Sequence, residues 1–412
     1  MTEKSTKPQL RFAGFDDTWE QRKLGEVLIS LQNNTLSRAD LSSEEGIAKN
    51  IHYGDILVKF GEVIDVKTES LPMIANETVI AKYKSSFLQN GDVIVADTAE
   101  DETVGKCTEI AGLSDEIVIS GLHTIPYRPL QKYAPGYLGY YMNSASFHNQ
   151  LLPLMQGIKV TSISKTALQN TDILYPKSAT EQAAIGKYFR NLDNLITLHQ
   201  RKYDKLTNVK KSMLEKMFPK NGSNVPEIRF KGFSDAWEQR KLGEIADKVT
   251  EKNGGLQYIE TFTNSAEFGI ISQRDFFDHD IAKIESLNGY YIVRNEDFVY
   301  NPRISTSAPV GPINRNKLGR IGVMSPLYTV FRPHDVDTTY LEHFFKSKYW
   351  HSFMNYNGDS GARSDRFSIK DSVFFEMPIP IPHIEEQRKI GAYLFHLDNL
   401  ITLHQRECYL SI

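Results

Sequence analysis

The sequence predicts an α+β protein in which two similar mixed α/β domains are separated by an antiparallel coiled coil of two helices, with an internal pseudo-twofold repeat. Residues 8–27 and 226–245 are identical at fourteen of twenty positions, and residues 181–201 and 386–406 at fifteen of twenty-one. Between these blocks the two halves differ strongly. A duplicated frame with two divergent inserts indicates one scaffold that presents two different recognition surfaces.

Each insert shows short strand signals and one helical signal. The runs GDILVKFGEVI (54–64) and GDVIVAD (91–97) are rich in β-branched residues and begin with Gly-Asp turn signals, so we expect strands there. Residues 137–155 have helical spacing, with an apolar face of Leu138, Tyr141, Phe147 and Leu151. The segments ILYP (173–176) and MPIPIP (377–382) are strand-like and lead into the helical blocks.

The helical blocks give the clearest structural prediction. Residues 180–218 contain no proline and one glycine, and Thr180 is expected to cap the helix start. Heptad spacing is typical of a helix that needs a partner, and it relates Ile185, Leu192, His199, Leu206 and Met213. The second copy begins in the same way but is shorter. We therefore expect the two helices to pair antiparallel and to leave the far end of the first without a partner.

The best-matched turns, 192–196 and 397–401, are also the most apolar, so we expect them to form the shared seam. The candidate coiled-coil and subunit-docking residues are Ile185, Leu192, Leu195, Ile196, Leu206, Ile390, Leu397, Leu400 and Ile401. The predicted boundaries are 1–179 for the first domain, 180–218 for the first helix, 219–384 for the second domain and 385–412 for the second helix.

Bulk composition excludes several classes of protein. A chain of 412 residues with 40% hydrophobic and 24% charged residues is typical of a globular protein with two or more domains. It contains no apolar run near the ~20 residues of a membrane span, and no signal peptide is evident at its start. The two cysteines, Cys107 and Cys408, argue against a disulfide framework or a zinc site and favour the cytoplasm. The net charge of −3 argues against a non-specific polycation.

Catalytic motifs are not evident. Residues 301–304 (NPRI) resemble the start of an amino-methyltransferase loop, but Ile304 stands where that loop needs an aromatic residue for a flipped base. No glycine-rich nucleotide loop and no hydrolase motif is found. His199 and His404 are interpreted as polar core residues that fix the helix register, because further metal ligands are not apparent. The sequence thus predicts no catalytic residue and no metal ligand.

The segments that differ between the halves are the candidates for recognition. Residues 156–165 correspond to 357–370, and residues 96–105 correspond to 300–311. All are polar and loop-like, and their donors suit phosphates and base edges, with Arg303 the best candidate for guanine. Ordinary solvated loops are the alternative. The candidate DNA-binding residues are Lys159, Thr161, Ser162, Lys165, Asn301, Arg303, Arg363, Ser364, Arg366 and Lys370.

The repeated motifs also resemble a known family. The two WEQRKLGE openings, the two EQ entries and the two helices with the pattern IGxYxxxLDNLITLHQR resemble the specificity subunit of a type I restriction-modification system, of the staphylococcal-like Gram-positive type. The resemblance spans nearly the whole chain. It implies two target-recognition domains, each of which reads one half of a bipartite site in double-stranded DNA. It also implies that the coiled coil sets the spacer.

The same resemblance implies partners and a biological role. The helices would dock two modification (methyltransferase) subunits, and restriction (motor and nuclease) subunits would join the full host-defence complex. This chain would then be non-catalytic and without a cofactor of its own, while S-adenosylmethionine, Mg and ATP would act in the partners. Two different inserts imply an asymmetric site. A protein-interaction scaffold that binds peptides or proteins is the alternative function, and salt-dependent, sequence-specific DNA binding would distinguish the two.

Overall fold

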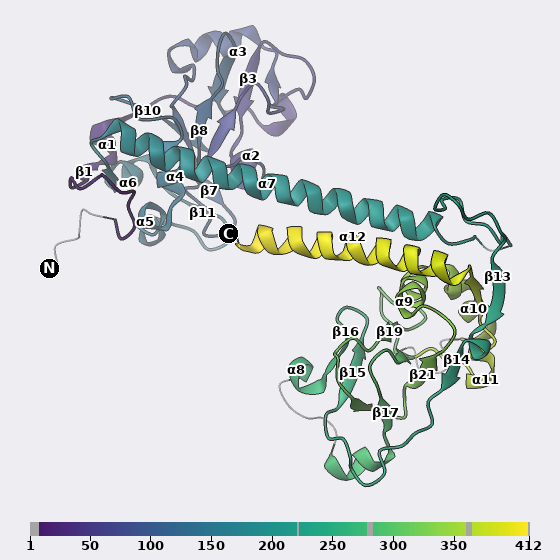
Figure 1. Ribbon diagram of the computed structural model, residues 1–412. Helices are drawn as coiled ribbons and strands as arrows, with labels where there is room; N and C mark the ends of the chain where they lie inside the picture. Colours follow the sequence, from purple (N-terminus) through teal and green to yellow (C-terminus); the bar gives the residue numbers. More distant parts are fainter. Residues whose placement is uncertain (1–7, 221, 278–282, 360–364, 411–412) are drawn as a thin grey trace. The chain divides into compact units, whose positions relative to one another are not determined.

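The computed structural model describes residues 8–220, 222–277, 283–359 and 365–410. The chain divides into two compact units, Met1–Leu195 and Ile196–Ile412, so the boundary falls inside the long helix α7 (Ala179–Lys216). Both units are mixed α/β, as the sequence predicts (Figure 1). Among the described helices, none is both long enough and apolar enough to cross a membrane.

The first domain is built on a five-stranded sheet in the order β2-β10-β6-β8-β4 and a three-stranded sheet in the order β5-β3-β9. Neighbouring strands are antiparallel except for the pairs β3–β9 and β4–β8. The strands are β2 (Leu28–Ser30), β3 (Ala48–Ile51), β4 (Val63–Asp65), β5 (Met73–Ile74), β6 (Val93–Ala96), β8 (Cys107–Ala111), β9 (Ile117–Ser120) and β10 (Thr124–Pro129). The helices are α1 (Leu24–Val27), α2 (Tyr53–Val58), α3 (Glu77–Lys82), α4 (Tyr137–Asn143), α5 (Ala145–His148) and α6 (Lys165–Gln169).

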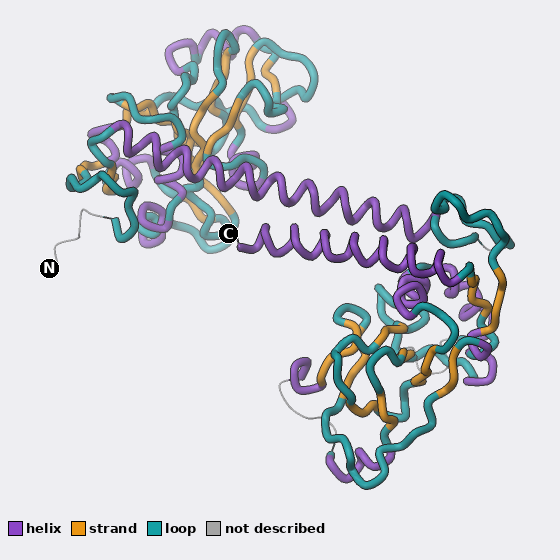
Figure 2. The backbone as a smooth tube through the Cα atoms, in the orientation of Figure 1, coloured by secondary structure: helices purple, strands orange, loops and turns teal. Residues whose placement is uncertain are grey.

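The second domain repeats the centre of this arrangement with a four-stranded sheet in the order β14-β21-β18-β19. These strands correspond to β2, β10, β6 and β8, and long loops connect them (Figure 2). The strands are β14 (Ala246–Lys248), β15 (Phe262–Ser265), β16 (Gly269–Ser272), β17 (Tyr291–Val293), β18 (Phe298–Tyr300), β19 (Ile313–Arg315), β20 (Gly322–Met324) and β21 (Thr329–Pro333). The helices are α8 (Gln273–Phe277), α9 (Thr338–Lys346), α10 (Tyr349–Asn357), α11 (Asp371–Phe374) and α12 (Ile384–Leu410).

The repeated sequence blocks make the same contacts in both domains. Strand β1 (Glu20–Lys23) pairs with β12 (Asp172–Tyr175), and β13 (Glu238–Lys241) pairs with β22 (Pro378–Ile381). Arg11 donates two hydrogen bonds of 2.7 and 2.8 Å to Glu181, and Arg229 donates two of the same lengths to Glu386. Both carboxylates are buried, so the bidentate arginine supplies the charge partner that a buried carboxylate needs. The frame therefore attaches each domain to the start of its helix.

Three local predictions are wrong in detail. Residues 54–58 belong to helix α2, because the His52 side chain accepts a hydrogen bond from the Gly54 N–H and caps a turn that buries Ile56. The predicted helix over 137–155 breaks at Ser144 into α4 and α5, although its four apolar residues are buried. Helix α7 begins one residue before Thr180, and the Ser178 hydroxyl accepts from the Glu181 N–H at 3.3 Å.

Within the second unit, α12 runs antiparallel to the C-terminal half of α7 (Figure 1). His199 meets His404, and Lys210 forms an ion pair with Asp398. The apolar seam joins Leu206, Val209 and Met213 of α7 to Ile390, Leu394 and Leu397 of α12.

The expected seam between the best-matched turns is therefore wrong. In an antiparallel pair of repeats, equivalent residues meet only at the local twofold axis, and here that position holds His199 and His404. Leu397 faces the region of Leu206, and Leu195 is 46% exposed. Of the other predicted helix residues, Ile185 packs on the core of the first domain, Ile390 is buried, and Leu192, Ile196, Leu400 and Ile401 are half-buried.

Candidate nucleic-acid interface

In the first domain, the two divergent segments lie side by side. Residues 156–162 form a hairpin that Gly157 makes possible, because its φ is +119° and a Cβ there would lie 1.9 Å from the Val160 carbonyl oxygen. The returning strand β11 (Thr161–Ser162) pairs antiparallel with β7 (Thr98–Ala99). The next residue, Ile163, is buried and donates its N–H to the Asp97 carbonyl at 2.9 Å. The hairpin is therefore held against the loop after β6.

The second domain repeats this junction with different side chains. Arg366 pairs with Arg303 through an antiparallel bridge. The next residue, Phe367, is buried and donates its N–H to the Pro302 carbonyl at 2.7 Å. The backbone positions that hold Thr98 and Ser162 in the first domain thus hold Arg303 and Arg366 in the second. One frame thus holds hydroxyl residues in one copy, where the Thr98 hydroxyl donates to the Asp97 carboxylate at 2.7 Å, and arginines in the other.

The predicted DNA-binding residues at and around this junction differ in solvent exposure. Lys159, Ser162, Lys165, Arg303 and Lys370 are exposed, and Thr161 and Arg366 are half-buried. Arg363 and Ser364 lie outside the described residues.

Asn301 differs from the other candidates because its amide is engaged within the domain. Its Nδ2 donates to the Asn264 carbonyl at 2.7 Å, and its Oδ1 accepts from the Arg303 N–H at 2.9 Å. Asn301 therefore shapes the loop that carries Arg303.

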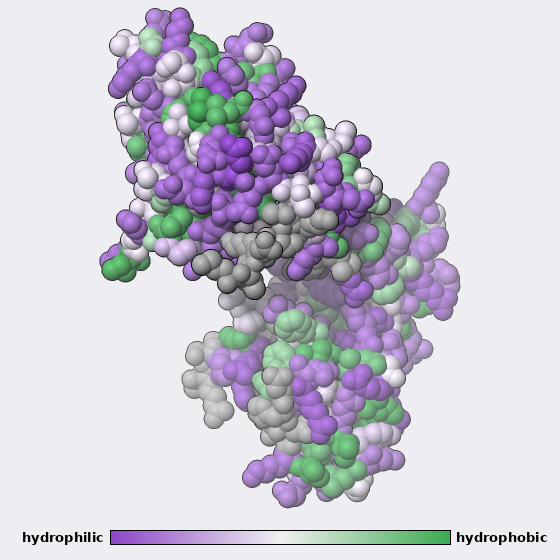
Figure 3. Space-filling view, turned by 90° about the vertical axis from the view of Figure 1, so that its left-hand side faces the viewer, coloured by the Kyte–Doolittle hydropathy of each residue, from purple (hydrophilic) through white to green (hydrophobic). Residues whose placement is uncertain are grey.

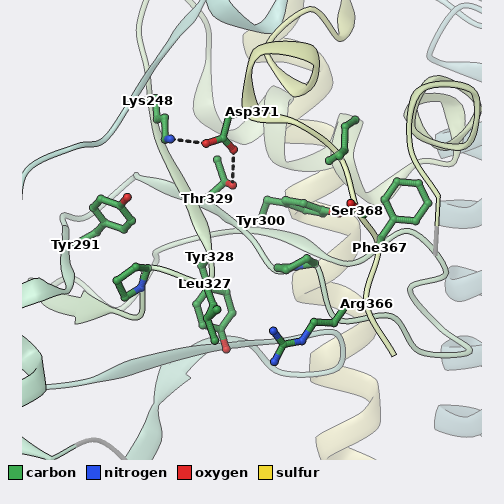
Figure 4. Close-up of a pocket in the computed structure, with 13 residues that line it drawn as sticks. Lys248, Tyr291, Tyr300, Leu327, Tyr328, Thr329, Arg366, Phe367, Ser368 and Asp371 are labelled. Atoms are coloured by element: carbon green, nitrogen blue, oxygen red, sulfur yellow. Dashed lines mark hydrogen bonds and ion pairs between the residues drawn. The ribbon is translucent and has the colours of Figure 1, made fainter. Parts of the chain in front are cut away.

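A cavity of 470 Å³ adjoins the junction in the second domain (Figure 4). Lys248 forms an ion pair with Asp371, and Thr329 donates to the same carboxylate at 3.2 Å. The hydrogen bond that Lys248 donates to Asp371 raises the pKa of Lys248. The Arg366 guanidinium lies beside Tyr328 at the other side of the cavity. This surface combines an arginine with aromatic rings, which suits hydrogen bonding and stacking.

A cavity of 540 Å³ occupies the corresponding place in the first domain. It is lined by the residues that follow β2, the end of α3, the start of β10 and the residues after the hairpin, among them Gln32, Lys82, Tyr83, Thr124 and Lys165. Asp97 also lines this cavity, and Glu100, Asp101 and Glu102 follow β7 and are exposed. Hydrogen bonds from the Thr103 hydroxyl and backbone lower the pKa of Asp101. Such carboxylates repel phosphates but can accept a hydrogen bond from cytosine N4.

Sequence reasoning missed two features of this site. Ile158 at the tip of the hairpin is fully exposed at 102%, and its neighbour Val160 is 55% exposed. An isoleucine next to a glycine turn is a sequence signal for such a tip, but polar residues dominate the pattern of this segment. Thr98 was also missed, although its segment was recognised as divergent. The face shown in Figure 3 mixes hydrophilic side chains with several apolar areas, so exposed apolar groups are not confined to the hairpin tip.

These two divergent surfaces on one repeated frame define a protein with two separate recognition modules. The profile of the family described as "Type I restriction modification DNA specificity domain" matches residues 16–208 and 234–408. The chain belongs to this family of type I restriction-modification specificity subunits. The assignment to a Gram-positive type stays a prediction from the sequence.

Similar proteins support this family assignment. A Methanocaldococcus jannaschii protein assigned as the specificity subunit of the type I restriction enzyme MjaX is 25% identical, and the match covers 95% of this chain and 89% of that protein. The specificity subunit of the type I restriction enzyme MjaVIII from the same organism is 25% identical over 61% of each chain. The crystal structure of a type I restriction-modification S subunit from M. genitalium has the same fold, with a TM-score of 0.51, 12% identity and coverage of 98% and 95%.

Proposed function

We propose that each domain of this specificity subunit reads one half of an asymmetric, bipartite site in double-stranded DNA. The observation that carries this proposal is a junction whose backbone pairing is the same in both domains while its side chains differ. Thr98 and Ser162 in one domain and Arg303 and Arg366 in the other stand at the same backbone positions. A guanidinium group prefers the guanine edge, whereas a hydroxyl group can bond to donor or acceptor edges, so two domains of this kind differ in the sequences that they read.

The helices supply the spacer and the docking surfaces for two methyltransferase subunits. Leu198 of α7 and Leu403 of α12 are equivalent residues of the repeat, and they are 46% and 48% exposed. Exposed leucines in matched places on two helices suit two copies of one partner. The net charge of −3 further supports a complex in which partner subunits supply part of the phosphate contact.

Catalysis then belongs to the partner subunits in the cytoplasm. The methyltransferase subunits would use S-adenosylmethionine, and restriction subunits would use Mg and ATP. This chain would contribute DNA recognition and spacing without a catalytic residue or a nucleotide cofactor of its own.

Co-expression with a type I modification subunit tests the proposal. Sequencing of the methylated host genome should show one asymmetric bipartite motif. The purified complex should bind that motif with an affinity that falls steeply as salt rises. A complex that methylates no specific motif and binds DNA without sequence preference would contradict the proposal. Specific capture of a peptide in its place would favour the scaffold.

A further inference from the structure

Three potential metal ligands converge on the seam between α7 and α12. The Nδ1 atoms of His199 and His404 lie 3.0 Å apart. The Glu407 Oε2 atom lies 2.7 Å from the first of these nitrogens and 3.1 Å from the second. The side chains of His199 and His404 are 18% and 14% exposed, and that of Glu407 is 38% exposed. The sequence predicts that the two histidines only fix the helix register, because the spacing along one helix does not reveal Glu407 as a third ligand.

The fold explains why these residues meet. His199 and His404 are repeat equivalents, 205 residues apart, and they face each other at the local twofold axis of the antiparallel helices. Glu407 lies three residues after His404 and therefore shares its face of α12. The equivalent residue on α7 is Lys202, so the carboxylate is present in one copy only.

Protons alone do not satisfy these three contacts. Glu407 as a carboxylate is an acceptor only, and each Nδ1 either carries one proton or offers one lone pair. If both nitrogens carry protons, the two N–H groups oppose each other across 3.0 Å. If one nitrogen lacks its proton, its lone pair faces the carboxylate. One of the three close approaches is therefore repulsive in each case, whereas a cation at the centre makes all three attractive.

We propose that His199, His404 and Glu407 bind a divalent transition metal ion, with zinc as the best match. Two imidazoles and one carboxylate form a common zinc ligand set, with metal–ligand distances of about 2.0–2.2 Å. Such distances place tetrahedral ligands about 3.3 Å apart, slightly wider than the present 2.7–3.1 Å. Water can complete the coordination on the side where Glu407 is exposed.

The neighbouring thiol is assigned no ligand role. The Cys408 Sγ atom lies 4.0 Å from the Ile196 carbonyl oxygen and 4.0 Å from the Gln200 side-chain oxygen. The bound metal would join α7 to α12 beyond the apolar contacts of Leu206 and Leu397 and would hold the register of the pair.

Isothermal titration of the untagged full-length protein with zinc chloride, after removal of metal with EDTA, tests the proposal. We expect one zinc ion per chain. Loss of an outer partner of a metal site already weakens affinity by about 10–100-fold, so Glu407→Gln and His404→Ala should weaken it by at least that factor. His396→Ala is the matched control, because His396 is exposed on the same helix, and it should bind as the wild type does.

Two further measurements keep the result interpretable. Circular dichroism should show that each variant is folded before titration, and zinc should raise the melting temperature of the wild type but not of His404→Ala. Glu407→Gln combined with Lys202→Glu places a carboxylate at the equivalent position and should recover part of the affinity. A wild-type chain that binds no zinc would overturn the proposal. Equal binding by folded wild-type, Glu407→Gln and His404→Ala chains would do the same.

Discussion

Arg303 and Thr98 occupy matching positions beside β11 or its counterpart, and their difference illustrates how single residues carry recognition here. The backbone contacts that hold them are the same in both domains. The side chains can differ because backbone pairing holds the junction in both domains. Residue-scale predictions therefore concern base selectivity rather than stability.

Arg303→Ala and Arg366→Ala should each relax one position of the second half-site. An arginine that binds guanine O6 and N7 contributes about 1–3 kcal/mol of discrimination. Methylome mapping and competition binding measure this directly. Arg320→Ala is the control, because Arg320 pairs with Glu260. A uniform loss of affinity on all sequences with a smaller salt slope would identify a phosphate contact instead.

Ile158→Ser should weaken discrimination at one position of the first half-site without a change in stability. A fully exposed isoleucine contributes little to the folded state, so the free energy of unfolding should change by less than about 0.5 kcal/mol. Its contact with a thymine methyl group would contribute about 1 kcal/mol. Leu130→Ser is the control for binding assays, because Leu130 follows the end of β10 and is 59% exposed. Equal effects of the two variants would exclude a specific role for the hairpin tip.

At the scale of elements, the helices combine a buried seam with exposed apolar residues. Leu397 is 6% exposed and packs with residues of α7 and the second domain, whereas Leu403 is 48% exposed. Leucines on one helix are thus either buried in the seam or exposed, and the antiparallel register decides which of them are buried.

Leu397→Ala should cost about 2–5 kcal/mol of unfolding free energy, because it leaves a cavity in a packed seam. Leu403→Ala should cost less than about 0.5 kcal/mol. Urea denaturation followed by circular dichroism would measure both. A Leu397→Ala chain as stable as the wild type would show that the α7–α12 seam is not a source of stability.

Leu198→Asp and Leu403→Asp should remove partner docking and leave the chain folded. If the two leucines mark two equivalent docking surfaces, each single variant should bind one methyltransferase subunit and the double variant none. Size-exclusion chromatography with light scattering gives the stoichiometry. Thr402→Asp adds the same charge at an exposed polar position and should keep both subunits. Full assembly by the double variant would place the docking surface elsewhere.

At the scale of the whole molecule, the repeat predicts that specificity is modular. The Arg11–Glu181 and Arg229–Glu386 pairs close the frame in the same way in both halves, and all four residues lie outside the inserts. An insert exchanged between these fixed points should therefore fold in this frame.

Replacement of residues 28–175 by the equivalent region of a relative should change one half-site of the methylated motif and leave the other. Methylome sequencing of a host that carries the chimera would show the new motif. The reciprocal exchange in the second domain is the control and should change only the other half. A chimera in which both half-sites change would refute independent reading by the two domains.

The sequence alone determined the duplicated frame, the mixed α/β class of the inserts and the two helices. These features rest on local patterns: identical motifs, the Gly-Asp turn before the β-branched run at 91–97, and heptads free of proline. Sequence comparison also located the divergent segments that contain Arg303 and Lys159. Such patterns can be recognised in the sequence because each depends on a few neighbouring residues.

Only the tertiary structure decided which distant residues meet. The pairing of Thr98 with Ser162, the break at Ser144 and the exposure of Leu195 depend on contacts between segments far apart in the chain. The antiparallel register brought His199, His404 and Glu407 together, although heptad spacing alone had indicated only two core histidines. Spacing along one helix defines a face, and the partner that packs on that face decides which residues become a seam or a site.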